Sequence, residues 1–397
     1  MKKLLLASAA TALLAGPGLA ASHSNEIKIG VLLGFTGPIE SLTPSIAAGA
    51  ELAMTEVNES GLLLDGATVT PVRGDSTCVD ASAATAVAER QITDDGIKGI
   101  MGADCSGVTG AVLANVAVPN GIVMISPSAT SPALSEAEDN GLFFRTAPSD
   151  ARQGEVMADV LMEQGVKEVA VTYTNNDYGK GLADAFQAAF EKAGGKVTIS
   201  AAHEDGKGDY SAEVGALDSA GGERLVVVGY VDQGGSGIVR AALDAGAFDT
   251  FHFPDGMIGD ALTEKFGDEI EGSSGQLPGT DSPGGDKFKE LAGDAADASS
   301  PFTPEAYDAA ALMMLAMQAA GSAEPGDYKD KIEMVANAPG EQIFPGELAK
   351  ALEILKNGGD IDYVGATAVE LIGPGESAGS YREITIKDGK IETVKYR

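Results

Sequence analysis

Residues 97–130, IKGIMGADCSGVTGAVLANVAVPNGIVMISPSAT, decide the fold of this chain. A short apolar run (97–101) leads into a hydroxyl-rich loop, and an Ala- and Val-rich segment with helical spacing follows. A second apolar run (122–126) then ends in another hydroxyl-rich loop. A strand, a helix and a strand in this order predict a βαβ unit with parallel strands. Because ligands of open α/β sheets bind outside the carboxyl ends of the strands, the two loops predict half of a small-molecule site.

The same alternation of strand and helix patterns continues along most of the chain. The runs that predict strands lie at 27–33, 69–73, 97–101, 122–126, 169–173, 196–200, 225–229 and 251–253. The segments with helical periodicity lie between them, at 44–58, 80–93, 107–116, 150–164, 179–193, 210–218 and 234–245. The stretch FRTAP (144–148) interrupts the series, which then restarts. The sequence therefore predicts an α/β protein of two lobes, each a doubly wound, mainly parallel sheet flanked by helices.

The last third of the chain follows a different order. The stretch 272–285, rich in Gly, Ser and Pro, is the most linker-like part of the sequence. Three helical segments follow at 304–320, 328–336 and 345–357, and strand patterns return near 366–372, 382–387 and 391–395. The turn KDGK (387–390) predicts a hairpin between the last two strands. Consecutive late helices predict a chain that returns to its first lobe.

The N-terminus has the pattern of an export signal. Lys2 and Lys3 precede an apolar run (4–15), and Gly18-Leu19-Ala20 forms a small-residue cleavage site. We predict a signal peptide over 1–20 and export of the rest to the periplasm; the alternative is a buried N-terminal helix. Later stretches are too short in apolar residues to span a membrane, so no stable membrane insertion is expected.

The charge balance excludes several partners. The chain has 27 Lys and Arg residues against 59 Asp and Glu residues, for a formal net charge of −32. Such an acidic surface argues against nucleic acid or an anionic membrane as a partner.

Cys78 and Cys105 are the two cysteines of the sequence. An isolated pair in an exported protein usually forms a disulfide, with a free thiol or a metal ligand as the alternatives. The chain has neither a CxxC spacing nor clustered histidines, so we expect neither a metal site nor a cofactor.

The candidate ligand contacts stand just past the ends of the predicted strands. Hydroxyls of Ser106, Ser128 and Thr130, with free N–H groups at the helix start near Gly107, suit a carboxylate. From the other lobe, Asp255 suits an ammonium group. Tyr178 and Tyr230 add a hydroxyl and an aromatic face at the strand ends of that lobe. This set predicts a zwitterionic ligand, a free α-amino acid.

Each of these residues also has a structural interpretation. Ser and Thr after a strand commonly cap helices, and Asp255-Gly256 is a turn signal in its own right. An enzyme of the hydrolase type is a further alternative, but GxSxG, HExxH and Walker A motifs are absent from the sequence. Of the three histidines, His23 stands beside the cleavage site, His203 ends a strand with no nucleophile in sequence, and His252 lies within a short strand as a packed or surface residue. We therefore expect a binding protein and not an enzyme.

Five segments together resemble a known family. These are IGVLLGFTGP (29–38), 103–109, GIVMISPSATSP (121–132), NDYGKGLA (176–183) and 253–256. In order and spacing they are similar to periplasmic solute-binding proteins of ABC transporters, of the leucine/isoleucine/valine-binding type. The resemblance implies a type I periplasmic binding protein fold, whose lobes close on a ligand and are joined by a three-segment hinge. It places 24–145 plus 278–370 in the first lobe, and 146–277 plus 371–397 in the second.

The resemblance also implies roles for individual residues. It implies a disulfide between Cys78 and Cys105. It also implies that Asp255 binds the ligand's ammonium group and that Phe302 lines the pocket for the ligand's side chain. The remaining contacts to the amino acid are implied for Ser106, Ser128, Thr130, Tyr178 and Tyr230.

Three positions depart from the family pattern. Asp255 stands where close relatives carry glutamate, Leu42 where an aromatic residue often lines the pocket, and Ser128 where alanine is common. An amine-bearing ligand is still expected, but its side chain need not be strictly aliphatic.

The function implied is capture of a branched-chain or related amino acid by a monomer, and its delivery to an inner-membrane ABC permease. The alternatives are the same fold binding an amide, a polyamine or an aromatic carboxylate, for import or for chemosensing.

Overall fold

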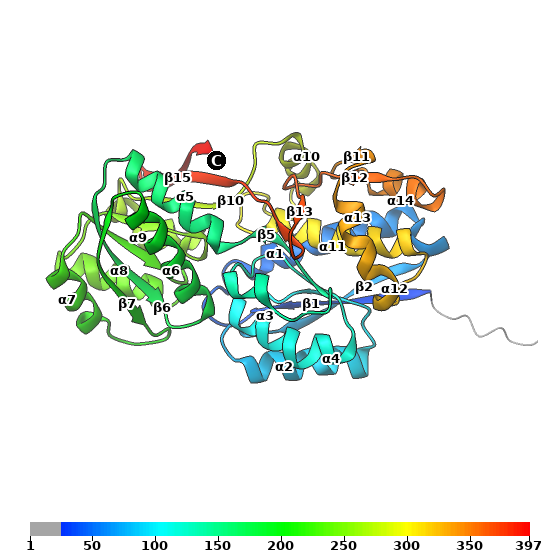
Figure 1. The fold of residues 1–397 in the computed structure, drawn as a ribbon, viewed down its shortest axis with the longest axis horizontal. Helices are drawn as coiled ribbons and strands as arrows, with labels where there is room; N and C mark the ends of the chain where they lie inside the picture. The colour runs from blue at the N-terminus through cyan, green and yellow to red at the C-terminus, as the bar shows by residue number, and fades with distance from the viewer. Residues whose placement is uncertain (1–24) are drawn as a thin grey trace, which may run out of the picture.

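The computed structural model describes residues 25–397; the predicted signal peptide (1–20) and His23 lie outside the described residues. Two seven-stranded sheets form two lobes, which lie side by side in Figure 1. The fold class predicted from the sequence is confirmed. No helix within 25–397 is both long and apolar enough to cross a membrane.

The first sheet has the strand order β13-β14-β5-β4-β3-β1-β2. Its strands are β1 (Glu26–Leu33), β2 (Thr68–Asp75), β3 (Ile100–Gly102), β4 (Met124–Ser126), β5 (Phe143–Pro148), β13 (Leu371–Ile372) and β14 (Glu376–Ser377). The strands β1 to β5 pair in parallel, as the βαβ pattern predicts. Both faces of β3 and β4 are buried, which explains their uninterrupted apolar sequences.

The second sheet repeats this design with the order β16-β15-β10-β9-β8-β6-β7. Its strands are β6 (Glu168–Thr174), β7 (Lys196–His203), β8 (Arg224–Val228), β9 (Phe251–Phe253), β10 (Ser274–Pro278), β15 (Tyr381–Lys387) and β16 (Lys390–Tyr396). The predicted late hairpin is the antiparallel pair β15 and β16. A separate two-stranded sheet contains β11 (Glu341–Ile343) and β12 (Ile361–Tyr363), which the sequence patterns did not reveal.

Helices cover both sheets. Those of the first lobe are α1 (Thr43–Ser60), α2 (Ala81–Arg90), α3 (Ser106–Val112), α4 (Val118–Asn120), α10 (Pro283–Ala292), α11 (Thr303–Ala320), α12 (Pro325–Tyr328), α13 (Ile332–Ala336) and α14 (Leu348–Lys356). Those of the second lobe are α5 (Asp150–Glu163), α6 (Asp177–Lys192), α7 (Ser211–Ala220), α8 (Gly234–Ala245) and α9 (Asp260–Phe266). The late helices pack in the first lobe: α11, buried over most of its length, contacts α1, α13 and α14. Gly49 permits the α1–α11 contact, since a Cβ there would lie 2.3 Å from the carbonyl oxygen of Thr303.

Three chain segments cross between the sheets. The first crossing follows β5 at Pro148, the second follows β10 at Pro278, and the third lies between Ser377 of β14 and Tyr381 of β15. The prediction assigned the whole of 371–397 to the second lobe, but β13 and β14 belong to the first sheet. These strands carry little apolar signal of their own. They are placed by the pairing of β14 with β5 and by a buried ion pair, at 2.5 Å, between Arg145 and Glu376.

The stretch 272–285, the most linker-like part of the sequence, contains the second crossing between the lobes, but the crossing itself is confined to the residues between β10 and α10. The rest of the stretch includes the buried strand β10 and the start of α10. Gly275 is required by close packing and not by chain flexibility, because a Cβ at this position would lie 2.4 Å from the carbonyl oxygen of Phe253. Composition alone does not separate these two reasons for glycine.

The lobes are in contact across the space between them. The backbone N–H of Asp232 in the second lobe donates to the carbonyl of Pro38 in the first, at 3.1 Å. The N–H of Ser41 donates back to Asp232 Oδ2 at 2.8 Å. The structure therefore represents a closed arrangement of the two lobes.

Candidate ligand-binding site

A cavity of about 20 Å³ lies between the lobes, at the carboxyl ends of the central strands. Six of the seven predicted contact residues line it: Ser106, Ser128, Tyr178, Tyr230, Asp255 and Phe302. The rest of the lining consists of Ile39, Leu42, Asp104, Cys105 and Gly256. The structure thus gathers around one cavity residues that are up to 196 positions apart in sequence, from Ser106 to Phe302.

The first-lobe wall is fixed by Asp104, which follows β3. Its carboxylate accepts hydrogen bonds from the N–H of Gly34 at 2.6 Å, from Ser76 Oγ at 2.9 Å and from the N–H of Cys105 at 3.0 Å. Burial raises the pKa of this carboxyl, and those three hydrogen bonds oppose the rise. The predicted disulfide between Cys78 and Cys105 is confirmed and joins the same loops. Sequence reasoning missed Asp104, although an acidic residue directly after an apolar run was a usable signal.

The two hydroxyl-rich loops are held together by their own serines. Ser106 Oγ accepts from the N–H of Ser131 at 3.1 Å, and Ser128 Oγ donates to the carbonyl of Asp104 at 3.1 Å. Ser126 Oγ, behind them, accepts from the N–H of Ala129 at 2.9 Å. This wall therefore presents neutral hydroxyls and backbone groups in a fixed arrangement, suited to an anionic group.

Thr130 is the one predicted contact that does not line the cavity. Its side chain is 1% exposed, and its carbonyl accepts a hydrogen bond from the N–H of Asp150 at 2.8 Å. Its hydroxyl oxygen has no hydrogen-bond partner. Because of this backbone bond to Asp150, Thr130 lies beside the first crossing between the lobes.

The second-lobe wall is aromatic and acidic. Tyr178, in the first turn of α6, stacks on Tyr230 with ring centroids 5.3 Å apart. Tyr178 donates its hydroxyl hydrogen to Asp255 Oδ1 at 2.6 Å, and the N–H of Gly256 donates to the same oxygen at 2.7 Å. Asn176 Nδ2 donates to the Tyr230 hydroxyl at 3.3 Å. These bonds hold the Asp255 carboxylate against the cavity.

The lining has an excess of negative charge. The described residues that line this cavity include two carboxylic acids, Asp104 and Asp255, and no lysine or arginine. Burial raises the pKa of Asp255 to about 6, while donors such as Tyr178 and Gly256 limit the rise. Burial and the charge of Asp255 raise the pKa of Tyr178, so its hydroxyl stays protonated and acts as a donor. A cation placed beside Asp255 would compensate this buried charge.

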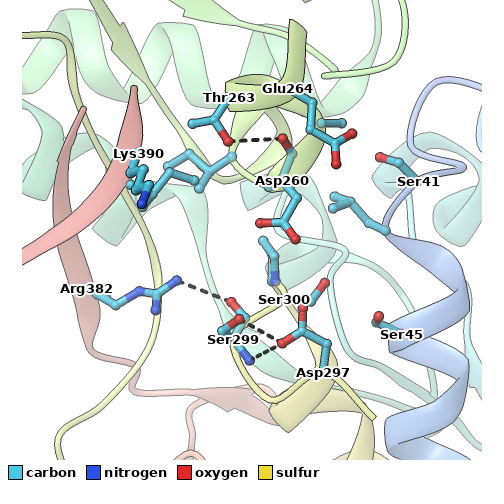
Figure 2. Close-up of a pocket in the computed structure, with 16 residues that line it drawn as sticks. Ser41, Ser45, Asp260, Thr263, Glu264, Asp297, Ser299, Ser300, Arg382 and Lys390 are labelled. Carbon is cyan, nitrogen blue, oxygen red and sulfur yellow. Dashed lines mark hydrogen bonds between the residues drawn. The ribbon is translucent and has the colours of Figure 1, made fainter. Parts of the chain in front are cut away.

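The remaining lining is apolar and separates the cavity from a larger pocket. Ile39, Leu42 and Phe302 form this part of the wall. Leu42 also lines a pocket of about 510 Å³ that is bounded by both lobes. Figure 2 shows Arg382 and Lys390 on one side of this pocket and Ser41 and Ser45 on the opposite side. A Cβ on Gly259 would lie 2.8 Å from Leu42 Cδ2, so the leucine side chain packs directly against the second lobe.

The described histidines lie away from the cavity serines. His203 Nδ1 is 2.8 Å from Thr172 Oγ1, and His252 Nδ1 is 2.9 Å from Ser274 Oγ. Burial lowers the pKa of His203 to about 4 and that of His252 to about 3. Both imidazoles are therefore neutral packing groups of the second sheet.

Two seven-stranded α/β lobes closed on a polar cavity define the class of two-lobed solute-binding proteins. The periplasmic binding protein family matches residues 26–345, and the chain belongs to this family. It is accordingly a solute-binding protein and not an enzyme.

Known proteins agree with this assignment. The chain is 38% identical over 234 residues to Leu/Ile/Val-binding protein homolog 3 of Brucella melitensis, an alignment that covers 58% of this chain and 61% of that protein. It is 30% identical over 306 residues to the leucine-, isoleucine-, valine-, threonine- and alanine-binding protein of Pseudomonas aeruginosa, which covers 76% of this chain and 80% of that protein. A leucine-binding protein of Thermotoga maritima has the same fold, with a TM-score of 0.78, 22% identity and coverage of 93% and 98% of the two chains.

Proposed function

We propose that this protein captures a free amino acid, of the branched-chain or a related class, between its two lobes. The observation that carries the proposal is the environment of Asp255. Its carboxylate is 1% exposed and faces a cavity whose lining, within residues 25–397, includes no lysine or arginine. An α-ammonium group at this point compensates a buried charge that otherwise costs free energy. The hydroxyls of Ser106 and Ser128 on the opposite wall then receive the α-carboxylate.

The cavity of about 20 Å³ is smaller than an amino acid, so the lobes must stand further apart when the ligand is bound than they do here. In that arrangement the side chain of the ligand would lie against the apolar part of the lining. Ile39, Leu42 and Phe302 supply this surface, and the names of the two relatives at 38% and 30% identity support aliphatic amino acids. Contact with both lobes makes the bound ligand part of the interface that stabilises closure.

Delivery to an inner-membrane ABC permease is part of the proposal. It is supported by family membership and by the export-signal pattern of residues 1–20, which also supports a periplasmic location. We propose that the protein acts as a monomer.

A longer amine-bearing solute is the second candidate. It is favoured by the 510 Å³ pocket beyond Leu42, whose acidic and basic side chains suit a polar extension. An amine-free carboxylate is disfavoured at neutral pH, since it leaves Asp255 without a counter-charge.

Mass spectrometry of the native protein, followed by calorimetry with a panel of amino acids, tests the function. We expect an amino acid to co-purify and at least one member of the panel to bind with a micromolar or lower dissociation constant. Tight binding of amine-free acids alone would overturn the proposal.

A further inference from the structure

A line of buried polar side chains runs behind the cavity, from Asp255 in the second lobe to Thr130 in the first. Gln153, on α5, lies between the carboxyl groups of Asp150 and Asp255. With its amide nitrogen facing both, Nε2 donates to Asp255 Oδ2 at 3.1 Å and to Asp150 Oδ1 at 2.9 Å. None of the four side chains is more than 1% exposed. Solvent therefore cannot supply the hydrogen bonds that these groups require.

The line ends in two atoms without hydrogen-bond partners, Asp150 Oδ2 and Thr130 Oγ1. The residues are neighbours, since the Asp150 N–H donates to the Thr130 carbonyl at 2.8 Å. The Thr130 hydroxyl is near enough to lower the pKa of Asp150, although the pair does not form a hydrogen bond of normal geometry. A hydrogen bond between these two oxygens, with either one as the donor, would satisfy both atoms. Leaving them unpaired would cost about 1–3 kcal/mol each.

The surroundings decide which carboxyl group holds a proton. Asp255 has three donors, from Tyr178, Gly256 and Gln153, so its charged form is the better stabilised of the two. Burial and the charge of Asp255 raise the pKa of Asp150 well above its usual value. The other titratable or charged groups that interact with the pair are Arg145, Glu305, Tyr178, Tyr230 and Tyr381. Of these, Arg145 is engaged by Glu376 at 2.5 Å and by the Ser131 carbonyl at 2.9 Å.

We propose that Asp150 and Gln153 are positioning residues for the ligand's ammonium group. Asp150 stays protonated and donates to Thr130, its other oxygen accepts from Gln153, and Gln153 donates to Asp255 to keep that carboxylate charged and directed at the cavity. The two residues also connect the loop behind the first wall to the acid of the second, across the first crossing of the chain. The inference rests on the proposed function for the identity of the ligand.

Two substitutions separate positioning from general support of the fold. Asp150→Asn keeps a donor for Thr130 and an acceptor for Gln153, so it imitates the protonated acid. Gln153→Met keeps the side-chain length but removes the donor to Asp255. Asp159→Asn, an exposed position on the same helix, is the matched control. Calorimetry with leucine as the probe, from about pH 5 to about pH 9, spans the range in which a raised carboxyl pKa acts.

Asp150→Asn should bind leucine within about threefold of the wild type at every pH, because neither hydrogen bonds nor charges change. Gln153→Met should raise the dissociation constant roughly tenfold near pH 6.5 and much less near pH 9, because one bond to the charged Asp255 is lost. If Gln153→Met weakens leucine binding by the same factor at all pH values, Gln153 has only a structural role. Tighter binding of Asp150→Asn at acidic pH would show that Asp150 was charged. Either result overturns the proposal.

A measurement without ligand distinguishes this inference from the proposed function. Difference infrared spectra of the free protein near pH 7.5 report carboxylic acid groups that stay protonated. Burial raises the pKa of Glu305 to about 8, so this residue also contributes to the band of buried carboxylic acids. The band should be equal in the wild type and in Asp159→Asn, and should be smaller by one carboxylic acid group in Asp150→Asn. An unchanged band in Asp150→Asn would overturn the inference even if leucine binds. Failure of every amino acid to bind, with the band reduced as expected, would instead refute the proposed function alone.

Discussion

The two walls of the cavity are built in different ways. The first-lobe wall consists of two loops of one βαβ unit, 97–130, held by short-range bonds among serines, the Asp104 carboxylate and a disulfide. The second-lobe wall gathers Tyr178, Tyr230 and Asp255 from three separate segments, each of which follows a different strand. In the first wall the Asp104 carboxylate is already bonded to three donors of its own lobe. The second wall presents the Asp255 carboxylate, which depends on residues behind it.

This difference predicts different responses to mutation and to pH. Hydroxyls and backbone groups do not titrate near neutrality, and the Asp104 carboxylate is stabilised by three hydrogen bonds within its own lobe. The first wall should therefore bind its part of the ligand independently of pH. The second wall contains Asp255, whose pKa is raised to about 6 by burial, so its contribution should change in the acidic range.

The largest effect is expected from removing the charge of Asp255. Asp255→Asn should raise the dissociation constant for leucine by about 100-fold or more, since loss of one partner of a buried charge pair costs about 2–5 kcal/mol. Calorimetry measures the constant, and Asp218→Asn, an exposed position on α7 of the same lobe, serves as control. If the affinity of Asp255→Asn stays within a few-fold of the wild type, Asp255 does not bind the ammonium group.

The wild-type protein should lose affinity as the pH falls through about 6. The ligand's ammonium group binds the deprotonated form of Asp255, so binding lowers the pKa of this carboxyl below its value in the free protein. Affinity is then constant above that pKa and falls about tenfold per pH unit below it. Titration calorimetry at several pH values checks the slope, which Asp255→Asn should abolish. Constant affinity from neutral pH down to about pH 5 would contradict this account.

The sequence predicts the first wall better than the second, for a physical reason. Ser106 and Ser128 follow apolar runs within one contiguous unit, so local patterns place them at the same sheet edge. Asp255 and Phe302 are also brought to the cavity, but their convergence depends on crossings that local patterns mark poorly. Phe302 was identified only through the family resemblance.

The positions that sequence reasoning missed depend on tertiary burial. In the sequence, Asp150 is an acidic residue in the first turn of a helix and Gln153 is an ordinary polar helix residue. Nothing in this pattern marks either residue as buried. Their burial follows from the packing of α5 against α6 and against the hinge strand β15. Thr130 differs from these two: its place after a strand predicts a ligand contact, and its buried side chain is not among those that line the cavity.

Removal of one hydroxyl from the first wall should have an intermediate effect. Ser106→Ala should raise the dissociation constant for leucine about tenfold, the lower end of the range for a hydrogen bond to a charged group. The factor should be the same near pH 5.5 and near pH 8, because no titrating group is removed. Ser82→Ala, exposed in the same lobe, is the control for calorimetry at both pH values. A factor that changes with pH would show that the two walls are not independent.

The smallest effect concerns the apolar boundary where the two walls meet. Leu42 separates the ligand cavity from the 510 Å³ pocket and packs against Gly259 of the second lobe. Leu42→Ala should raise the dissociation constant for leucine by only about two- to fivefold, since part of one apolar contact is lost. It should also favour the binding of amino acids with longer side chains relative to leucine. Calorimetry with leucine and lysine measures the ratio of their dissociation constants, with Val79→Ala, 54% exposed in the wild type, as control. An unchanged ratio would mean that the large pocket is closed to the ligand even without Leu42, and that the selectivity for side chains is set by Phe302 and Ile39 instead.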